Sequence, residues 1–513
     1  MNPQIDTSKY KVLTEGSASV LFPPDQVFYN PVQQYNRDLS SLAIRAFSEI
    51  YYEEKLARKR KHDKESPDLK DSEPQPYLRI LEALSATGLR AIRYGKEIPL
   101  VSKVVANDLS KDAVNAINLN IEYNKIQDKV EANEGDAIRV MADSKDQFHV
   151  VDLDPYGTAA PFVDSALNSL KDGGLLLVTC TDLGVLAGAG YPEKCFALYG
   201  GSPLHGDVTH ESALRLVLHM ISTTAAKYKK WIEPQLCLSI DFYVRLFIRV
   251  RTSPIKVKEL ASNQMICYKC SGCYAIYNQP LGRWTENPNA TAKQNSKKYG
   301  LSKGPPVGPE CTFCGFTNHL CGPMWRGPLH NPAFIDRVLG LEESADESIF
   351  KTRPRIKGML TMAKNELVDV PFHIKTTTVS AILKGPSPSL DTFAAALSNL
   401  GYRVSLCHST PGAIKTDAPY EVIWYVGKLW TEKNGVTADK LNPNTAGHRI
   451  MTDNSIGKNI DLASLNKEKK VDDITWLFQP NGESKKLKEL RKIKIVRYQE
   501  NPTANWGPKA RPH

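Results

Sequence analysis

Short apolar runs alternate with amphipathic helical patterns from Tyr77 to about residue 256. The apolar runs predict strands near residues 79–84, 103–107, 130–133, 149–153 and 175–180. The patterns between and after them predict helices over residues 89–97, 111–124, 161–170 and 210–227. Two closely spaced runs, 236–241 and 246–251, predict a terminal hairpin. Strands that alternate with helices in this way are typical of βα units in a parallel sheet.

Seven strands with the last one antiparallel fit the methyltransferase form of the doubly wound sheet better than the dinucleotide-binding form. We therefore predict an α/β fold whose residues 1–256 form a Rossmann-like, seven-stranded, S-adenosylmethionine-dependent methyltransferase domain. A basic and then acidic segment, residues 53–76, precedes the first strand and has the composition of a solvated insertion.

The remaining residues, 257–513, have a different pattern and predict a second, smaller domain of mixed α/β structure. Six of the ten cysteines lie between residues 257 and 330. Beyond them, we expect helices over 355–366 and 389–400 and strands over 403–407 and 421–426. The polar stretch 432–474 gives no clear prediction.

Length and composition restrict the class of protein. A chain of 513 residues is too long for a single small binding module, and its 41% hydrophobic and 24% charged residues are ordinary for a folded protein. The longest apolar runs are the size of a strand, far below the ~18 residues that a membrane span needs. We therefore expect no integral membrane segment. No obligate protein partner is evident.

The net charge of +10 is concentrated at the C-terminus. Residues 485–513 carry nine Lys or Arg against two Glu, with Tyr498 and Trp506 among them. Cations with interleaved aromatic rings suit a polyanion such as RNA, although a solvated tail without a ligand has the same composition. A second basic run, Lys55–Lys64, lies in an expected loop and is interpreted as a nuclear import signal.

The first residues contain neither an apolar signal core nor an Arg-rich amphipathic pattern. We therefore expect a nuclear protein with reduced cysteines. A mitochondrial destination is the alternative, but no transit peptide is visible.

Three loops are predicted to meet at one edge of the sheet. The small-residue turn Ser85–Arg90 follows the first strand, Asp108 ends the second, and Gly135-Asp136-Ala137 follows the third. Such a turn lets the backbone approach a ligand, and a carboxylate at the second strand end can accept the hydroxyls of a ribose. No complete G-x-G-x-x-G is present, which favours S-adenosylmethionine over NAD. Taken alone, Asp108 could equally be a helix cap.

Asp154-Pro155-Tyr156-Gly157 comes directly after the predicted strand 149–153. An exocyclic amine conjugated to a base is a poor nucleophile, so acceptors must hold its N–H groups and aim its lone pair at the methyl donor. Asp154 and the carbonyl of Pro155 are suitable acceptors, and Tyr156 offers a face for the base. A β-turn without chemical meaning is the alternative.

Two C-x-x-C pairs, Cys270/Cys273 and Cys311/Cys314, are separated by 37 residues. Paired cysteines at this spacing predict a tetrahedral zinc site of structural type. Cys267 and Cys321 are the rival ligands.

Several of these motifs together resemble the tRNA guanine-26 N2,N2-dimethyltransferase family, and the fungal members most closely. The resemblance is carried by Phe28–Ser40, Glu82–Tyr94, Asn107–Leu109, Asp152–Thr158 and Asn501–Pro512. It implies that Asp154 is the catalytic carboxylate and that the cofactor is surrounded by Arg37, Arg90, Asp108, Asp136 and Ala137. It also retains Cys270 and Cys273.

The prediction is therefore an enzyme that transfers methyl groups from S-adenosylmethionine to N2 of guanine 26 in tRNA, with a zinc domain and basic tail that bind the RNA. Two alternatives remain at this stage. An amino methyltransferase that acts on DNA shares the Asp-Pro-Tyr chemistry, and a non-catalytic zinc scaffold could bind RNA without turnover. The expected product is N2-methyl- and then N2,N2-dimethylguanosine.

Overall fold

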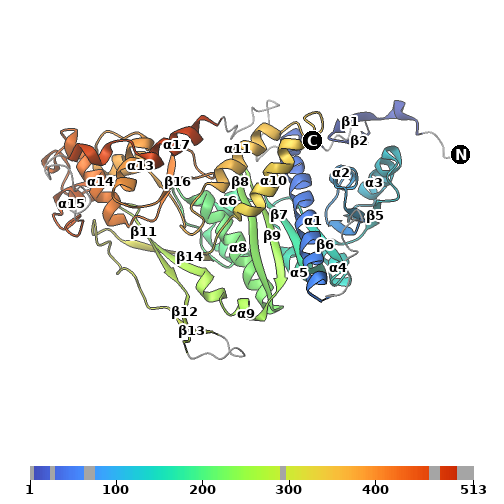
Figure 1. The fold of residues 1–513 in the computed structure, drawn as a ribbon, viewed down its shortest axis with the longest axis horizontal. Helices are drawn as coiled ribbons and strands as arrows, with labels where there is room; N and C mark the ends of the chain where they lie inside the picture. The colour runs from blue at the N-terminus through green and yellow to red at the C-terminus, as the bar shows by residue number, and fades with distance from the viewer. Residues whose placement is uncertain (1–4, 24–28, 63–74, 289–295, 461–473, 494–513) are drawn as a thin grey trace.

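A seven-stranded sheet lies at the centre of the computed structural model, which describes residues 5–23, 29–62, 75–288, 296–460 and 474–493 (Figure 1). Its strands are β3 (Leu78–Glu82), β4 (Val101–Asp108), β5 (Val130–Glu134), β6 (Phe148–Leu153), β7 (Leu170–Cys180), β8 (Lys230–Ile240) and β9 (Tyr243–Thr252). They lie in the order β5-β4-β3-β6-β7-β9-β8, and only β9 runs against its neighbours. The predicted parallel sheet and its terminal hairpin are confirmed. The strand order reverses between β3 and β6, which is where ligands bind in sheets of this kind.

Helices cover both faces of the sheet, so the central strands are buried on both sides. One face is covered by α1 (Gln34–His62), α2 (Leu89–Glu97) and α3 (Lys111–Asn124), with α10 (Pro332–Ser344) and α11 (Arg353–Lys364) packed beside them. The other face is covered by α4 (Ala137–Asp143), α5 (Val163–Ser169) and α8 (Thr209–Lys227). Side chains alternate between the two faces along each strand. In β3, Ile80 packs in the core on the α1 face and Leu81 in the core on the α8 face.

Helices α2 and α3 begin and end at the predicted residues, but the loop expected for the basic run is wrong for residues 55–62. These residues continue α1 rather than forming a loop. Lys, Arg and Glu have high helix propensity, so a charged run is compatible with a surface helix. Glu54 also pairs with Arg249 at 2.6 Å and Arg251 at 3.0 Å in β9, which holds this part of the helix on the sheet. The rest of the insertion, residues 63–74, lies outside the described residues.

Smaller sheets follow in the second half of the chain. β10 (Gln264–Cys270), β11 (Ile276–Pro280) and β14 (Asn318–Trp325) form one of them, in the order β11-β10-β14. β12 (Gly282–Glu286) and β13 (Lys297–Leu301) form a separate hairpin that projects from the body (Figure 1). The last sheet comprises β15 (Ile374–Lys375), β16 (Val404–Leu406) and β17 (Ala413–Thr416).

The helices around this last sheet are α12 (Thr376–Leu383), α13 (Leu390–Asn399), α14 (Tyr420–Lys433), α15 (Ala446–Thr452) and α17 (Gly482–Lys492). The predicted helices near 355–366 and 389–400 and the strand near 403–407 are confirmed as α11, α13 and β16. The predicted strand over 421–426 is wrong, because these residues lie in α14. Val422, Ile423 and Val426 are buried at helical spacing, and a short apolar run does not separate that pattern from a buried strand.

α10 and α11 pack against α1 and share its hydrophobic core, although they come from the second half of the chain. A domain boundary at residues 256/257 stays a prediction. Within the described residues, no helix has the length and apolar character needed to cross a membrane.

Candidate functional site

The turn after β3 lies at the point where the strand order reverses. Gly88 has φ of 78° and is the N-cap of α2, and Ala86 also has positive φ, at 51°. A Cβ on Gly88 would lie 3.2 Å from Ile117 in α3. The turn therefore requires glycine both for its backbone conformation and for the close approach of α3.

The ends of β4 and β5 are joined to this turn. One carboxylate oxygen of Asp108 accepts the N–H of Ala86 at 2.9 Å, and the other accepts the N–H of Ser110 at 2.9 Å. Ser110, and not Asp108, is the N-cap of α3, so Asp108 is not simply a helix cap. Each carboxylate oxygen has a further lone pair, so Asp108 can still accept hydrogen bonds from a ligand.

Asp136 and Ala137 lie where α4 begins. Asp136 is the N-cap of α4, and its side chain accepts the N–H of Ile138 at 2.8 Å. Ala137 is the first residue of the helix, so its N–H has no acceptor within the helix and can bind a ligand. The predicted crevice residues Asp108, Asp136 and Ala137 thus follow neighbouring strands on one edge of the sheet.

Two asparagines that the sequence did not single out as site residues hold these loops together. Asn107 donates to the carbonyls of Ala83 at 2.9 Å and Gly135 at 3.0 Å, and it accepts from Asn133 at 2.7 Å. The backbone N–H of Gly135 also donates to the Asp108 carbonyl at 3.0 Å. The three strand ends therefore form one hydrogen-bonded unit.

Asp154-Pro155-Tyr156 follows β6, on the other side of the switch point from β3. The side chain of Asp154 is 22% exposed, Pro155 is buried, and Tyr156 is 76% exposed. Gly157, with φ of 80°, exchanges hydrogen bonds with Thr181 beyond β7, each 2.8 Å long. The motif is therefore a fixed turn with a partly exposed carboxylate and an exposed aromatic ring.

Arg90, in the first turn of α2, contacts the Asp154 carboxylate through Nη2. The same guanidinium lies 3.4 Å from Asp152 and 3.5 Å from Glu82, and it is buried. Asp152 is in turn bound by Arg245 at 2.8 Å and by Tyr94 at 2.6 Å. A chain of alternating charges therefore runs from the interior of the sheet to Asp154.

The electrostatics of this cluster are set by burial and by the two arginines. Burial raises the pKa of Glu82 to about 8, and the neighbouring carboxylates of Asp152 and Asp154 add to the rise against the opposing effect of Arg90. Burial also acts to raise the pKa of Asp152, but Arg245 and Arg90 outweigh it and lower that pKa below its ordinary value. Burial and then the Asp154 charge raise the pKa of Tyr156 to about 12. At neutral pH, Tyr156 is therefore a neutral phenol.

Arg37, the remaining predicted cofactor residue, lies in α1 and binds a different partner. Its guanidinium is bidentate on Glu15, at 2.7 and 2.5 Å, and donates to the carbonyl of Asn30 at 3.1 Å. The adjacent Asn36 reaches Arg90 at 3.5 Å. Arg37 therefore lies beside the Arg90 cluster but contacts neither Asp108 nor Asp136.

The four predicted metal ligands converge. Their sulfur atoms lie within 4.8 Å of one another and all four side chains are buried. Cys270 Sγ is 3.3 Å from Cys314 Sγ, and Cys273 Sγ is 3.6 Å from Cys311 Sγ. The backbone N–H groups of Gly272 and Cys273 donate to Cys270 Sγ, which favours a thiolate there.

The rival ligands Cys267 and Cys321 lie opposite each other on β10 and β14, within the core on the α8 face of the seven-stranded sheet. Cys267 donates to Asn278 at 3.3 Å, and burial raises the pKa of both thiols. Buried thiols of this kind behave as small apolar side chains. The group of four is therefore the better metal site.

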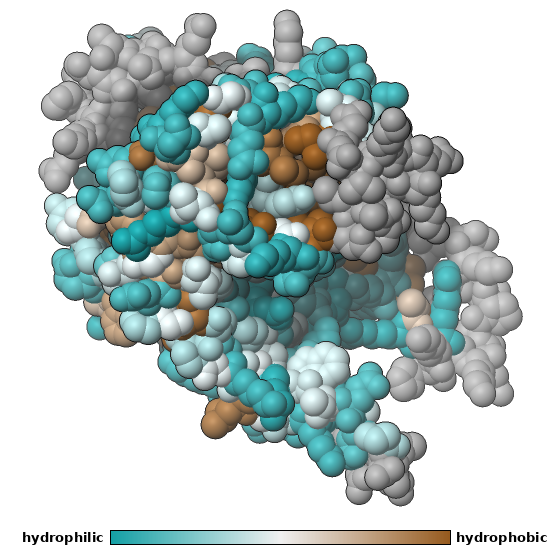
Figure 2. Space-filling model, turned by 90° about the vertical axis from the view of Figure 1, so that its left-hand side faces the viewer, coloured by the Kyte–Doolittle hydropathy of each residue, from teal (hydrophilic) through white to brown (hydrophobic). Residues whose placement is uncertain are grey.

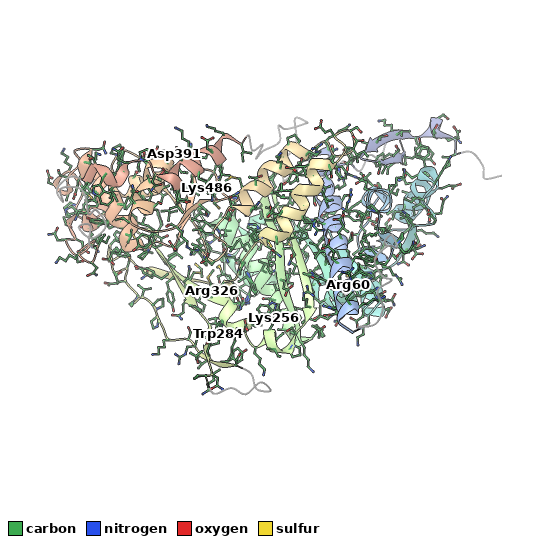
Figure 3. The ribbon with its side chains drawn as sticks, viewed as in Figure 1. Arg60, Lys256, Trp284, Arg326, Asp391 and Lys486 are labelled. Carbon is green, nitrogen blue, oxygen red and sulfur yellow. The ribbon has the colours of Figure 1, made fainter. Side chains whose placement is uncertain are left out.

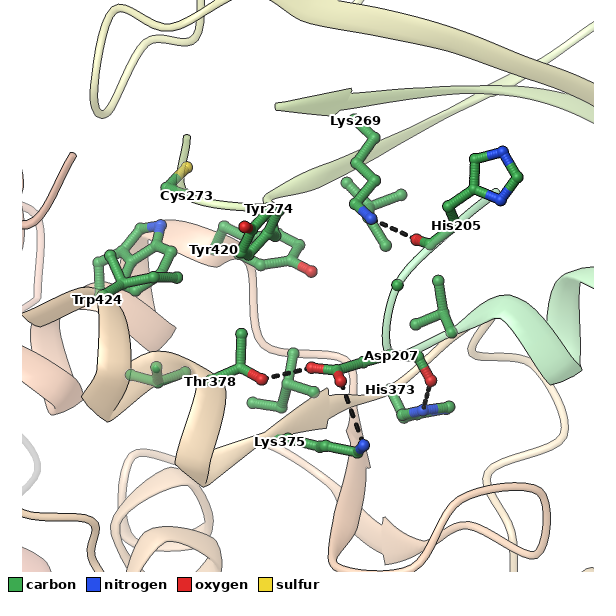
Figure 4. Close-up of a pocket in the computed structure, with 16 residues that line it drawn as sticks. His205, Asp207, Lys269, Cys273, Tyr274, His373, Lys375, Thr378, Tyr420 and Trp424 are labelled. Carbon is green, nitrogen blue, oxygen red and sulfur yellow. Dashed lines mark hydrogen bonds and ion pairs between the residues drawn. The ribbon is translucent and has the colours of Figure 1, made fainter. Parts of the chain in front are cut away.

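A cavity of about 440 Å³ lies between the loop 205–208 before α8, the end of β10, α12 and the start of α14 (Figure 4). Asp207 joins the two halves of the chain there, through an ion pair with Lys375 at 3.1 Å and a hydrogen bond from Thr378. None of the predicted catalytic or cofactor residues lines this cavity, so it is separate from the crevice at Asp154.

A buried charge cluster also joins the two halves. Lys415, whose side chain is 2% exposed, lies 3.1 Å from Glu211 in α8 and 3.3 Å from Glu366 beyond α11. These carboxylates belong to two groups with metal-ligand geometry, Glu211/His373/Cys407 and His330/Glu366/His408. The Lys415 ammonium contacts both carboxylates and Arg215 pairs with Glu211 at 2.7 Å, so we assign the positive charge at this position to these side chains rather than to a metal.

Known proteins match almost the whole chain. Residues 8–428 match the family model described as N2,N2-dimethylguanosine tRNA methyltransferase. The mitochondrial tRNA (guanine(26)-N(2))-dimethyltransferase of Saccharomyces cerevisiae is 47% identical over 100% of this chain and 94% of its own length. The Schizosaccharomyces pombe enzyme of that name is 41% identical over 98% of this chain and 92% of its own.

A solved structure extends the match to the fold. Trm1 from Pyrococcus horikoshii, described as a complex with S-adenosyl-L-methionine, aligns with a TM-score of 0.64 and 28% identity. The alignment covers 81% of this chain and 99% of that one. Neither the DNA methyltransferase alternative nor the non-catalytic scaffold is supported by these matches. The sequence relatives and the arrangement at the switch point agree, and the chain belongs to the N2,N2-dimethylguanosine tRNA methyltransferase family.

Proposed function

We propose that Asp154, Pro155 and Tyr156 form the catalytic site of this enzyme, an S-adenosylmethionine-dependent methyltransferase that dimethylates N2 of guanine 26 in tRNA. The observation that carries the assignment is the position of Asp154 at the switch point, fixed by Arg90 and only partly exposed. The carboxylate of Asp154 accepts an N–H of the guanine amine, and the Pro155 carbonyl accepts the other. Tyr156, exposed and neutral, stacks on the base after it leaves the tRNA helix.

The crevice residues fit the cofactor. Asp108 keeps free lone pairs for the ribose hydroxyls, and the Ala137 N–H is available to the adenine. S-adenosylmethionine, when bound, supplies an electrophilic methyl group that the N2 lone pair attacks, with the methyl–sulfur electron pair going to sulfur. The amine loses one N–H proton in each transfer, and Asp154 is placed to receive it. Arg90 keeps the carboxylate oriented before the substrate arrives.

The group of four cysteines supports a structural zinc ion. Four sulfurs at about 2.3 Å from zinc lie about 3.8 Å apart in a tetrahedron, close to the spacing of the two pairs described above. Four thiolates leave no open coordination position, so this zinc would take no part in methyl transfer. It would join the β10 end to the loop before β14.

The second half of the chain and its basic tail are proposed to bind tRNA. Residues 482–492 form α17, with Leu487 buried against α13 and Lys485, Lys486 and Lys488 exposed. The remainder of the tail, residues 494–513, lies outside the described residues. A helix that buries its apolar side while its lysines face solvent suits a phosphate-binding surface.

The nucleus is the proposed location of the enzyme. Arg58, Lys59 and Arg60 are exposed near the end of α1 and accessible to an import receptor. The Saccharomyces cerevisiae relative is described as mitochondrial, so mitochondria are the second candidate.

One experiment tests the proposed reaction. The protein is incubated with labelled S-adenosylmethionine and either unmodified tRNA or duplex DNA, and the nucleic acid is digested to nucleosides. We expect label in N2-methyl- and N2,N2-dimethylguanosine from tRNA alone, and none in a tRNA whose guanine 26 is replaced by adenine. Label in DNA, or none in either substrate, would contradict the proposal.

A further inference from the structure

The β12–β13 hairpin projects from the protein and carries an excess of positive charge (Figure 1). Among the described residues from 281 to 304, Glu286 is the single acidic side chain against Arg283, Lys297, Lys298 and Lys303. A two-stranded hairpin has no core of its own and contributes little stability in isolation. Its projection and its positive charge therefore indicate that the hairpin binds a partner molecule.

The strand register separates two faces of the hairpin. Arg283 pairs with Gly300 and Thr285 with Lys298, so Arg283 and Lys298 are diagonal neighbours on one face. Both side chains are exposed, and no carboxylate of the described residues lies within 4.0 Å of either. This face offers two cations whose charge no neighbouring carboxylate neutralises.

Trp284 is held in place on the opposite face. Lys297 lies 3.8 Å from the centroid of its ring and forms an ion pair with Glu259 at 2.7 Å, which ties the hairpin to the residues before β10. The tryptophan nevertheless remains 41% exposed. An exposed aromatic ring that is already ordered loses little conformational entropy on binding.

The base of the hairpin adds further cations. Gly282 packs so closely on Ala261 that a Cβ there would lie 2.7 Å from the alanine side chain. Lys258, which is exposed, lies three residues before Ala261 in the chain. Arg326 is also exposed, and its backbone N–H donates to the Asn263 carbonyl at 2.7 Å. Figure 3 shows Trp284, Arg326 and Lys256 in this part of the molecule. Figure 2 shows the projection below a hollow with a hydrophilic floor.

We propose that the hairpin and its base, with exposed Lys258 and Arg326, bind the sugar–phosphate backbone of the tRNA substrate through both faces of the hairpin. Arg283 and Lys298 bind phosphates on one face, and Trp284 packs against a nucleoside on the other. Two exposed cations with no carboxylate of the described residues within 4.0 Å, on a hairpin whose other face carries an ordered aromatic ring, suit a nucleic acid better than an acidic protein, because only the nucleic acid supplies both phosphates and flat rings. The inference rests on the proposed function, since the partner is the substrate of that reaction.

The first test neutralises Arg283 and Lys298. In the Arg283→Gln/Lys298→Gln variant, we expect the Kd for tRNA to rise about tenfold near physiological salt. The slope of log Kd against log salt should decrease by about two, because each lost phosphate contact lowers it by about one. The kcat at saturating tRNA should stay within twofold of the wild-type value, because neither residue lies at the Asp154 site.

The matched control is Lys351→Gln/Lys357→Gln, which removes two exposed cations beside and within α11, on the other side of the molecule from the hairpin (Figure 1). This control should leave Kd and the salt slope unchanged. Trp284→Ala should weaken binding about tenfold with no change in the salt slope, because the lost contact is not ionic. Unchanged thermal unfolding and metal content would establish that the variants are folded.

Unchanged Kd and salt slope in both hairpin variants, with the wild-type protein still methylating tRNA, would overturn the inference alone. Loss of affinity in the α11 control equal to that in the hairpin variant would also overturn it, because the effect would then depend on net charge. Failure of the wild-type protein to methylate tRNA would instead count against the proposed function.

Discussion

Arg90 joins Asp154 to the interior of the sheet, because its guanidinium contacts Asp154 and lies 3.4 Å from the buried carboxylate of Asp152. The carboxylate that we propose as catalytic is therefore held by a group that is itself fixed. Preorganised polar groups cost no reorganisation when charge develops in the transition state. Arg90, expected from the sequence to surround the cofactor, is in a position to orient Asp154 as well.

Replacing Asp154 with Ala should lower the methylation rate about 10²–10³-fold, because the guanine amine loses the acceptor that orients it. Binding of tRNA should stay within twofold, since in the proposed mechanism Asp154 contacts the base rather than the RNA backbone. Single-turnover methylation and filter binding measure the two effects. Asp143→Ala, an exposed carboxylate in α4, is the control and should behave as wild type. Near-normal turnover in Asp154→Ala would show that the mechanism is wrong.

The buried Glu82 predicts a pH dependence of stability. Its pKa is about 8 in the folded protein against an ordinary value of 4.5, so between these pH values the folded state holds a proton that the unfolded state has released. The free energy of unfolding should therefore fall by up to about 1.4 kcal/mol per pH unit as the pH rises through this window. The stabilisation is complete below the lower pKa.

Glu82→Gln should remove this contribution, because the amide cannot ionise. Denaturant unfolding of the wild type and the variant at several pH values from 5 to 8 would measure the difference in slope. The contributions of other groups cancel in that difference. Parallel pH profiles for the two proteins would contradict the assignment of a raised pKa to Glu82.

The sequence predicted α2 and α3 to the residue because their signals are local. Ser110 caps α3, and Gly88 marks the turn before α2. The prediction of the catalytic residues also rests on a local signal, since they follow an apolar strand at the edge where ligands bind, and their catalytic role stays a prediction. These features depend on a few neighbouring residues and on the known geometry of a parallel sheet.

The partners of Arg90 could not be found in this way. Glu82 and Asp152 interrupt apolar strands, and Arg245 lies in β9, 93 residues after Asp152. Their contact depends on strand order and register, which no local pattern encodes. The strand predicted at 421–426 is wrong for a related reason. The apolar run is too short to show a helical period by itself, and only the packing of α14 shows which of its side chains are buried at helical spacing.

The zinc prediction concerns metal content. We expect one zinc per chain, lost in Cys311→Ser and retained in Cys267→Ser, because Cys267 lies in the other core. Elemental analysis of the purified proteins measures it. Removing the metal with a chelator should lower the thermal unfolding temperature, since the four buried thiolates would then repel one another. Zinc lost from Cys267→Ser and kept in Cys311→Ser would reverse the assignment.

A truncation that tests the basic tail has to leave α17 intact. Deleting residues 485–513 would remove Leu487 from its contact with α13 and confuse lost binding with lost packing. Deleting 494–513 leaves the helix in place and removes four basic residues, Lys494, Arg497, Lys509 and Arg511. We expect weaker tRNA binding with a smaller salt slope. An unchanged slope would assign RNA binding to the rest of the second half.

Lys415 connects the two halves of the chain, because it contacts Glu211 in the first half and Glu366 in the second. Replacing it with Met keeps the side-chain length but leaves the carboxylates of Glu211 and Glu366 buried without their shared cation. Breaking a buried ion pair from one side costs about 3–5 kcal/mol, so the free energy of unfolding should fall by that order.

The triple variant Lys415→Met/Glu211→Gln/Glu366→Gln separates charge from packing. It removes both carboxylate charges together with the cation, and should recover part of the stability lost in Lys415→Met because neither carboxylate is left buried without the lysine. Recovery should be incomplete, since Glu211 also pairs with Arg215 at 2.7 Å. Denaturant unfolding of the three proteins measures these differences. A triple variant less stable than Lys415→Met alone would show that the carboxylates are held by their other partners and that Lys415 acts through packing.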